Sequence, residues 1–382
     1  MSEFIPVSEP LLDGNEKKYL AECIDSGWIS SEGAFVTRFE KEFAARVGRK
    51  HGIAVTNGTA AIDAAVVALG IGPGDEVILP TFTIISCVLQ IVRLGATPVL
   101  VDSDPLTWNM DVSQIEAKIT PRTKAIMVVH IYGLPVDLNP VIDLCKRHHL
   151  KLIEDAAEMI GQSYRDKPCG SFGDVSTVSF YSNKHITTGE GGMILTDDHD
   201  IATGCRALRN LCFEPGRRFV HHQLGWNLRM TNLQAALGIA QLERLEELVL
   251  KKRWIGHRYN ELLTNLGGVQ TPLVKTEYAE NIYWVYGLVL DDCVEIDAAA
   301  AMSQLAKLGI GSRPFFYPMH EQPVLREMGL FEGESYPVAE TMARRGFYIP
   351  SGLALTDGDL QKVSANVSEV LRPYQLSGPG TA

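Results

Sequence analysis

The feature that most constrains the fold is a series of short apolar segments that show no polar alternation. They are rich in β-branched residues, and helical stretches separate most of them. The segments are HGIAV (51–55), VILP (77–80), TPVLVD (97–102), KAIMVVHIYG (124–133), LKLIEDAAE (150–158), VSTVSFY (175–181) and GGMILTDD (191–198). Strands without alternation are buried on both faces, and intervening helices favour parallel pairing. The sequence therefore predicts an α/β fold around a mainly parallel sheet.

The pattern changes near residue 237. Residues 234–263 have the spacing of one long amphipathic helix, and residues 282–290 and 299–309 follow as a short apolar segment and a helix. We predict a large α/β domain over residues 1–249 and a smaller α+β domain over residues 250–375. The last residues, 376–382, are predicted to be disordered.

Charge, hydropathy and cysteine content exclude several function classes. The formal net charge of −11 disfavours binding to a nucleic-acid backbone. No apolar segment approaches the roughly 20 residues that span a bilayer, and the N-terminus has no signal-peptide pattern. The seven cysteines are scattered without a CxxC pair, which disfavours zinc, an iron–sulfur cluster and a disulfide framework. We expect a cytoplasmic protein that binds no nucleic acid, membrane or metal.

The first candidate site is Asn57-Gly58-Thr59, between the first predicted strand and a helix. Ligands of open α/β sheets bind beyond the carboxyl ends of the strands, which is where this turn lies. Backbone N–H groups at a helix N-terminus and the Thr59 hydroxyl would suit a phosphate. The alternative is an ordinary turn in which Thr59 caps the helix.

The second candidate is the acidic segment 154–158, which directly follows a predicted buried strand. Carboxylates there cost desolvation free energy unless a cation meets them. A protonated pyridine nitrogen would meet that need, and Asp155 beside it would keep the ring an electron sink. A metal, without an accompanying His cluster, and a pair of helix-capping carboxylates are the alternatives.

The third candidate is Lys184, which follows the strand VSTVSFY and precedes a Gly-rich segment. Poor solvent access would lower the pKa of its amine and make it nucleophilic. Ser179 could place its hydroxyl on the same phosphate as Thr59. The alternative is a solvated loop lysine.

Two further segments are less specific. Asn232 begins the long helix and is either a cap or a phosphate ligand. The loop GWISSEGAF (27–35) holds Trp28 and either connects two helices or edges an active site. None of these segments specifies a function alone, but their order at one edge of one sheet indicates a common site.

With these residues in order, the chain resembles the DegT/DnrJ/EryC1/StrS family of nucleotide-sugar aminotransferases, which are fold-type-I enzymes of pyridoxal 5′-phosphate (PLP). The resemblance covers residues 10–372. The matching motifs are NGTAA, GIGPGDEVILP, ATPVLVD, TKAIMVVHIYG, IEDAAE, SFGDVSTVSFYSNK, TTGEGGM, RMTNLQAALGIAQLERL and RPFFYPMH. Within the family, residues 13–44 and 183–193 are most similar to the GDP-perosamine synthases.

The resemblance implies roles for individual residues. Lys184 would be the catalytic residue and would bind PLP through its amine. Asp155 would pair with the pyridine nitrogen, and Glu158 would lie near the ring and its phenolic oxygen. The remaining cofactor contacts would be Gly58, Thr59, Ser179, Asn183 and Asn232, and Asn232 would reach the cofactor of the neighbouring subunit in a homodimer with shared active sites. The substrate contacts would be Trp28, Ser30, His185, Arg229, Arg313, Tyr317 and His320.

The chain departs from the family pattern in PTFTIISC (80–87). Ile84 stands where an aromatic side chain usually stacks on the cofactor ring. We expect the aliphatic Ile84 to cover the ring face instead, with help from Phe82.

The resemblance implies ping-pong transamination through pyridoxamine 5′-phosphate. L-Glutamate would donate the amine, and GDP-4-keto-6-deoxymannose would accept it to give GDP-perosamine for O-antigen, other polysaccharide or glycoside biosynthesis. The alternatives are another keto sugar nucleotide (UDP- or dTDP-linked, aminated at C4 or C3), a PLP-dependent sugar 3-dehydratase and a non-catalytic PLP-binding regulator. The dehydratase branch carries His in place of the lysine, and a regulator would need an extra domain or a basic tail, which the sequence lacks.

Overall fold

The seven predicted strands form one sheet in the computed structural model, which describes residues 4–214, 216–217 and 219–374. The sheet order is β1-β9-β8-β5-β4-β2-β3. The strands are β1 (His51–Val55), β2 (Glu76–Pro80), β3 (Thr97–Val101), β4 (Thr123–Val129), β5 (Lys151–Asp155), β8 (Val175–Ser179) and β9 (Gly192–Thr196). From β8 to β3 all neighbours pair in parallel, so the predicted mainly parallel sheet is confirmed.

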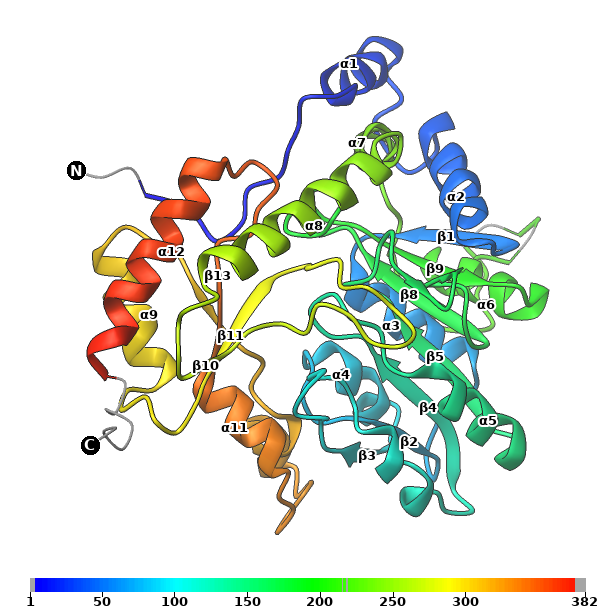
Figure 1. Ribbon diagram of the computed structural model, residues 1–382. Coiled ribbons are helices and arrows are strands. Elements are labelled where there is room, and N and C mark those ends of the chain that lie inside the picture. Colours follow the sequence, from blue (N-terminus) through cyan, green and yellow to red (C-terminus); the bar gives the residue numbers. More distant parts are fainter. Residues whose placement is uncertain (1–3, 215, 218, 375–382) are drawn as a thin grey trace, which may run out of the picture.

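Helices cover both faces of this sheet (Figure 1). On one face lie α3 (Gly58–Ala68), α4 (Ser86–Arg93) and α6 (His199–Arg209). On the other lie α2 (Ala34–Val47), α5 (Leu138–His148) and α7 (Asn232–Leu242). The apolar strands are therefore buried on both sides, which explains why they show no polar alternation.

The strand β9 is the exception, because it pairs antiparallel with both β1 and β8. A parallel return needs a long crossover, usually a helix. The chain between Ser179 and Gly192 forms no helix, so it turns back at the carboxyl end of β8 as a loop. That loop carries Lys184.

The C-terminal part forms a second, antiparallel sheet with the order β10-β11-β13-β12. Its strands are β10 (Val269–Gln270), β11 (Tyr286–Leu290), β12 (Arg313–Pro314) and β13 (Gly346–Ile349). Its core is shared with α8 (Leu245–Leu262), α9 (Ala298–Lys307) and α12 (Asp357–Leu371). This agrees with the predicted smaller α+β unit. The boundary at residue 249 falls inside α8 and stays a prediction, and residues 376–382 lie outside the described residues.

Two features of the connections differ from the prediction. The single long helix is two helices, α7 and α8, separated by Glu243 and Arg244. Glu243 accepts hydrogen bonds from Asn15 and Tyr19 at the start of α1 (Glu16–Ser26), and Arg244 is paired with Asp13. These tertiary contacts interrupt a helix that the periodicity alone would continue.

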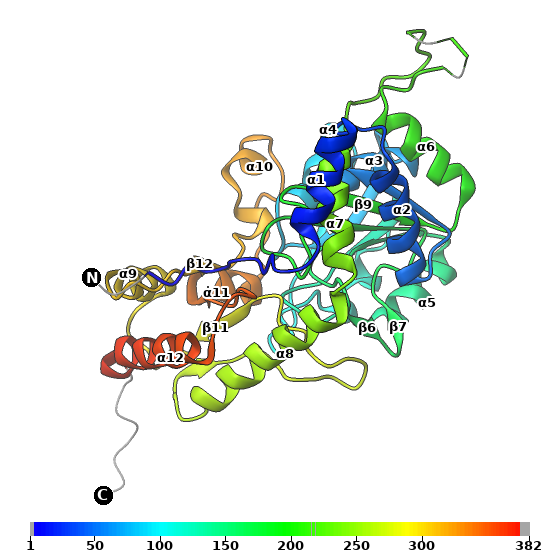
Figure 2. The same ribbon diagram turned by 90° about the horizontal axis from the view of Figure 1, so that it is seen from above.

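Residues 5–9, which the prediction assigned to the large domain, pack on the smaller one. Ile5 forms a bridge with Ile310, and its N–H donates to Gly309 O at 2.9 Å. Figure 2 shows this segment running beside α9 before it reaches α1. Ile5 is apolar and 5% exposed, so it completes the core of the smaller unit.

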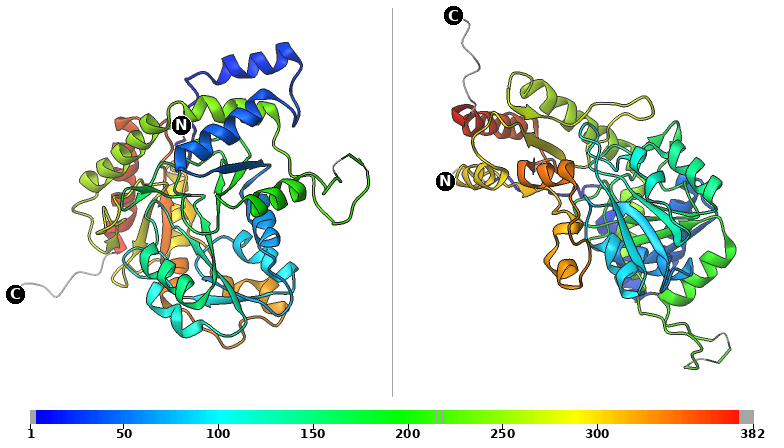
Figure 3. Two further views of the ribbon diagram at one scale, coloured as in Figure 1. Left: turned by 90° about the vertical axis from the view of Figure 1, so that its right-hand side faces the viewer. Right: turned by 90° about the horizontal axis from the view of Figure 1, so that it is seen from below.

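Contacts between the two units fix the small sheet beside the large one. Asp102, after β3, accepts the N–H groups of Val338 and Ala339 at the start of α11 (Pro337–Arg345), which lies near both sheets (Figure 3). Gly133 O accepts the N–H of Ile282, and a side chain at Gly133 would come within 2.3 Å of Asn281 Oδ1. The segment before β11 is thereby held against the end of β4. No helix among the described residues is long and apolar enough to cross a membrane.

Candidate active site

A cavity of about 460 Å³ lies at the carboxyl ends of the large sheet. The predicted residues that line it come after β1, β5 and β8, which the parallel order brings to one edge. They are Gly58, Thr59, Asp155, Glu158, Ser179, Asn183 and Lys184. The structure therefore brings together the sequence-predicted carboxylates, hydroxyls and amine.

The start of α3 forms a corner of the cavity whose polar groups suit an anion. Asn57 Oδ1 accepts the N–H of Ala60 at 2.8 Å, and the N–H groups of Gly58 and Thr59 have no acceptor within the helix. Thr59 Oγ1 lies 2.8 Å from Ser86 Oγ. The corner thus offers helix-terminal N–H groups and hydroxyls, the chemistry that binds a phosphate.

Position 58 lies so close to Ser179 that only glycine fits there. A Cβ atom at residue 58 would lie 2.9 Å from Ser179 Cβ. The missing side chain lets the Ser179 hydroxyl, at the end of β8, line the same cavity as Thr59. This is the placement that the sequence predicted for the two hydroxyls.

Asp155 is a buried carboxylate at the end of β5, with 3% of its surface exposed. Oδ1 accepts the N–H of Ala157 at 3.0 Å, and Oδ2 accepts the Cys87 thiol at 3.4 Å. Among the described residues it forms no ion pair, and burial raises its pKa. A carboxylate that is desolvated and has only neutral donors stabilises a cationic group brought into the cavity.

Glu154, the neighbour of Asp155, faces away from the cavity because successive strand residues alternate. Its carboxylate contacts His130 Nε2 at 3.1 Å and accepts the N–H groups of Gly170 and Phe172. These hydrogen bonds account for the buried charge of Glu154. Asp155 therefore lines the cavity, whereas the adjacent Glu154 forms hydrogen bonds on the other face of the sheet.

Lys184 projects into the cavity from the β8–β9 loop. Its side chain is 9% exposed, and its Nζ lies 3.9 Å from Glu158 Oε1 and 3.6 Å from the centroid of the Trp284 ring. Burial lowers the pKa of its amine. An amine that loses its proton more easily is a better nucleophile and base.

Glu158 accepts the N–H of Tyr132 at 2.7 Å. Burial raises the pKa of its carboxyl to about 8, against the lowering effect of Lys184. At neutral pH the carboxyl therefore largely keeps its proton and can donate a hydrogen bond.

The elevated pKa of Glu158 predicts a pH-dependent stability of the protein without cofactor. The folded state keeps a proton that the unfolded chain releases above the ordinary value of 4.5, so stability is lost as pH rises from 4.5 towards about 8. Glu158→Gln removes this titration and is expected to raise Tm at pH 8 by about 2 °C or more. Thermal unfolding at pH 4.5 and pH 8 checks this, with Glu42→Gln on the surface as control. Equal effects of Glu158→Gln at both pH values would contradict the assignment.

The cavity fits the cofactor that the resemblance implies. A phosphate group suits the corner of Gly58, Thr59 and Ser179, and a protonated ring nitrogen suits Asp155. Two buried polar atoms of the lining, Thr177 Oγ1 and Asn183 Oδ1, have no hydrogen-bond partner among the described residues. Such atoms lower their free energy when a polar ligand enters.

Several predicted site residues lie elsewhere. Phe82 is fully buried and packs on the rings of Tyr132, Phe315 and Phe316, so it does not reach the cavity. Ile84 does line it, with 47% of its surface exposed. Ile84 therefore lies where it can contact a ring bound in the cavity, and Phe82 does not.

The two predicted histidines are buried and do not line the cavity. His185 is fully buried, its Nε2 lies 3.3 Å from Ile282 O, and burial lowers its pKa to about 3. His320 is 1% exposed, with Nδ1 2.8 Å from Thr81 Oγ1 and Nε2 3.1 Å from Glu340 Oε1. Neither lines the cavity, because both side chains fix contacts between elements.

In the segment RPFFYPMH the cavity residue is Phe316. Arg313 and Tyr317, which were predicted, are exposed and do not line the cavity.

Asn232 is 2% exposed and does not line the cavity of its own chain. Its side chain accepts the N–H of Phe35 at 3.0 Å and donates to Trp28 O at 2.7 Å. The amide therefore fixes the loop 27–35 of its own chain, and its contact with the cofactor of a neighbouring subunit stays a prediction. Trp28, Ser30 and Arg229 line a separate hollow of about 1120 Å³ beside that loop.

Sequence reasoning missed the aromatic wall that the smaller unit contributes. Trp284 and Tyr348 line the cavity, from the segment before β11 and from β13. Trp284 Nε1 donates to Asn183 O at 3.0 Å, next to Lys184. No motif marks these aromatics, and only the packing of the two units brings them to Lys184.

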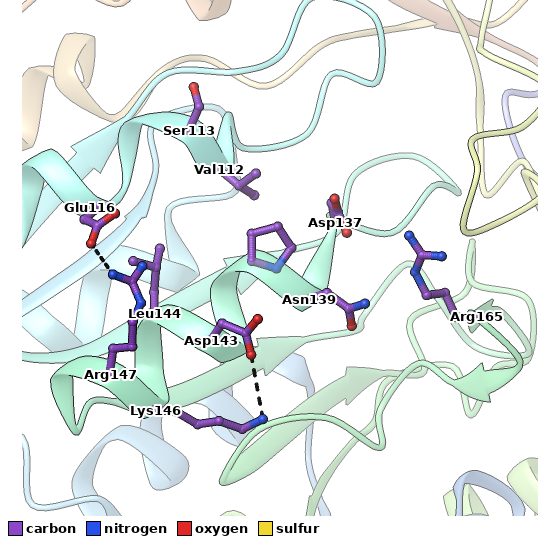
Figure 4. Close-up of a pocket in the computed structure, with 11 residues that line it drawn as sticks. Val112, Ser113, Glu116, Asp137, Asn139, Asp143, Leu144, Lys146, Arg147 and Arg165 are labelled. Atoms are coloured by element: carbon purple, nitrogen blue, oxygen red, sulfur yellow. Dashed lines mark hydrogen bonds and ion pairs between the residues drawn. The ribbon is translucent and has the colours of Figure 1, made fainter.

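Another hollow, between α5 and the turns η1 (Val112–Gln114) and η2 (Glu116–Lys118), is shown in Figure 4. Its charged side chains are largely paired with each other, Glu116 with Arg147 and Asp143 with Lys146. It does not contain a buried titratable group like those around Lys184, so we place the chemistry in the Lys184 cavity.

Known proteins resemble this chain along almost its whole length. Three GDP-perosamine synthases are 46% identical over 368 residues (Caulobacter vibrioides), 43% over 360 (Vibrio cholerae) and 40% over 367 (Escherichia coli O157:H7). The alignments cover 96%, 94% and 96% of this chain and 98%, 97% and 98% of those relatives.

Solved structures and a family model agree with this. The aminotransferase TlmJ from Streptoalloteichus hindustanus superposes with a TM-score of 0.88 at 30% identity, covering 96% of this chain and 98% of that one. DesV of S. venezuelae, solved with a ketimine intermediate, gives the same values. Residues 10–368 match the model of the DegT/DnrJ/EryC1/StrS aminotransferase family. The chain belongs to this family.

Proposed function

We propose that this chain is a PLP-dependent aminotransferase that moves the amino group of L-glutamate onto C4 of GDP-4-keto-6-deoxymannose, giving GDP-perosamine. The observation that carries the proposal is the buried amine of Lys184 in one cavity with Asp155 and the hydroxyls of Thr59 and Ser179. The likeness to three GDP-perosamine synthases over nearly the full chain supports the choice of sugar nucleotide.

PLP, when bound, supplies an aldehyde that accepts amines and a ring that stabilises the charge left after a proton is removed. Thr59, Ser179 and the N–H groups of α3 would hold its phosphate, and Asp155 would accept a hydrogen bond from its protonated ring nitrogen. Lys184 would hold the cofactor through its amine and, once released, Nζ would accept a proton from the substrate carbon and return it. Protonated Glu158 would donate a hydrogen bond to an oxygen on the ring.

Lys184 and His185 together favour amination over dehydration. The dehydratase branch uses a histidine in place of the lysine, and here the neighbouring His185 is buried against Ile282 O. It therefore does not offer an alternative base in the cavity.

The experiment is turnover of purified, PLP-loaded protein with glutamate and a panel of keto sugar nucleotides. We expect release of 2-oxoglutarate that depends on GDP-4-keto-6-deoxymannose, a product whose mass corresponds to replacement of the keto oxygen by an amino group, and an NMR spectrum that places this group at C4. Preference for a UDP- or dTDP-linked sugar, or amination at C3, would overturn the sugar assignment. A deoxygenated product would favour the dehydratase, and specific DNA retention without glutamate turnover would favour the regulator.

We also propose a homodimer with shared active sites. Two large apolar side chains that line the hollow beside the loop 27–35 are exposed, with 58% for Trp28 and 50% for Ile29. A second copy would cover them and could bring Trp28, Ser30 and Arg229 to the partner's cavity. Light scattering should give twice the chain mass of 42.0 kDa, and a monomer with full activity would rule out shared sites.

We place the enzyme in the cytoplasm. All seven cysteines are free thiols, and six of them are buried. A reducing compartment keeps such thiols unpaired. Fractionation of the native host checks this expectation.

A further inference from the structure

Lys252 is a second buried lysine, outside the cavity. It lies on α8 with 2% of its surface exposed, and Nζ donates to Trp284 O at 2.8 Å and to Ser351 O at 2.6 Å. Among the described residues it has no carboxylate partner within ion-pair distance. Burial and the positive charge of Lys184 lower its pKa to about 7.

The two carbonyls that Lys252 binds belong to the two segments that form the aromatic wall of the cavity. Trp284 itself lines the cavity, and Ser351 follows three residues after Tyr348, which lines it too. Lys252 therefore ties together, from behind, the two chain segments whose side chains face the site.

Trp284 in turn contacts Asn183 and the amine of Lys184. Trp284 Nε1 donates to Asn183 O at 3.0 Å, and the centroid of its ring lies 3.6 Å from Lys184 Nζ. A cation over an indole face is stabilised by the ring quadrupole, and this geometry holds only while the main chain of Trp284 stays in place.

Stability alone does not explain a lysine here. Burial of an amine without a carboxylate costs free energy, and an unbranched apolar side chain could fill the same space. What such a side chain cannot do is satisfy the two buried carbonyls of Trp284 and Ser351.

We propose that Lys252 is a positioning residue for the aminotransferase reaction, fixing the main chain of Trp284 so that the indole holds the amine of Lys184 in place. This inference rests on the proposed function. Lys252 does not line the cavity, so it would act through Trp284 and not by contact with substrate or cofactor. Either protonation state of Lys252 can donate to the two carbonyls.

The test compares Lys252→Met with Lys252→Gln and with the control Lys251→Met. Met matches the length of lysine but donates no hydrogen bond, whereas Gln keeps a donor without charge. Lys251 is the adjacent, partly exposed lysine, 5.3 Å from the Trp254 ring. For Lys252→Met we expect kcat to fall by roughly 10- to 100-fold with KM for glutamate little changed. Gln should recover part of kcat, and the Lys251 variant should resemble wild type.

Two measurements on protein without cofactor test the positioning role of Lys252 independently of the proposed aminotransferase activity. Lys252→Met should change the tryptophan fluorescence and should speed acetylation of Lys184 by acetic anhydride, followed by peptide mass spectrometry. An unchanged fluorescence spectrum and labelling rate would overturn the positioning role, whatever the activity of the wild type. Absence of glutamate turnover in wild type, with both readouts changed, would overturn only the proposed function.

A second variant keeps the proposal testable if Lys252→Met does not fold. Trp284→Phe leaves Lys252 and its two acceptors in place but removes the N–H that binds Asn183. It should lower kcat and speed labelling of Lys184 as well. Wild-type kcat and labelling in Trp284→Phe would overturn the proposal.

Discussion

Lys184→Ala is expected to lower glutamate-dependent release of 2-oxoglutarate by at least about 10²–10⁴-fold, the share that a positioned proton-transfer group contributes. Lys184 carries the only primary amine among the described residues that line the cavity. Loss of the covalent hold on the cofactor adds to the effect. The measurement is kcat with saturating PLP, glutamate and GDP-4-keto-6-deoxymannose.

The fold should tolerate this change, because it removes a buried amine whose pKa is lowered by desolvation. Thermal unfolding should therefore show a Tm at or above that of wild type. A small primary amine such as methylamine should restore part of the activity by entering the space that the side chain vacates. Full activity of Lys184→Ala without added amine would show that the central residue is misassigned.

Asp155→Asn is expected to lower kcat/KM by about 10²–10³-fold, the usual effect of removing one electrostatic contact at a reacting centre. The amide is nearly isosteric but carries no charge, so it no longer favours a protonated ring nitrogen. The protein without cofactor should become more stable at neutral pH, because the burial that raises the pKa of Asp155 is a cost of keeping it charged. Opposite changes in activity and Tm are therefore the signature of this site.

Asp63→Asn is the matched control. Asp63 lies on α3, its Oδ1 has no partner among the described residues, and burial also raises its pKa. It does not line the cavity, so its amide variant should gain stability without losing activity. If Asp155→Asn behaved like this control, the pairing with the ring nitrogen would be wrong.

The sheet and the core of the site could be predicted from the sequence for one physical reason. Thr59, Asp155 and Ser179 follow or end apolar strands, and parallel pairing brings those ends to one edge. Lys184 is reached from the same edge, although the antiparallel direction of β9 was not predicted. Its loop forms no helix and turns back at the carboxyl end of β8, which is a property of the whole connection and not of any motif.

What could not be predicted depends on contacts between distant segments. His185 is adjacent to Lys184 in sequence, yet it is buried against the segment before β11. His320 is polar and lies in a family motif, but Thr81 and Glu340 enclose it. Trp284, by contrast, lines the cavity although no local sequence pattern marks it. Only the packing of the smaller unit on the large one brings it there.

The most direct test of the central claim is to find the residue that holds the cofactor. The PLP-loaded protein is reduced with sodium borohydride, which fixes the cofactor on its lysine, and the labelled peptide is identified by mass spectrometry. We predict a single label on Lys184, and none on Lys252, the other buried lysine. A label on another lysine, or no label on protein that carries stoichiometric PLP, would contradict the assignment.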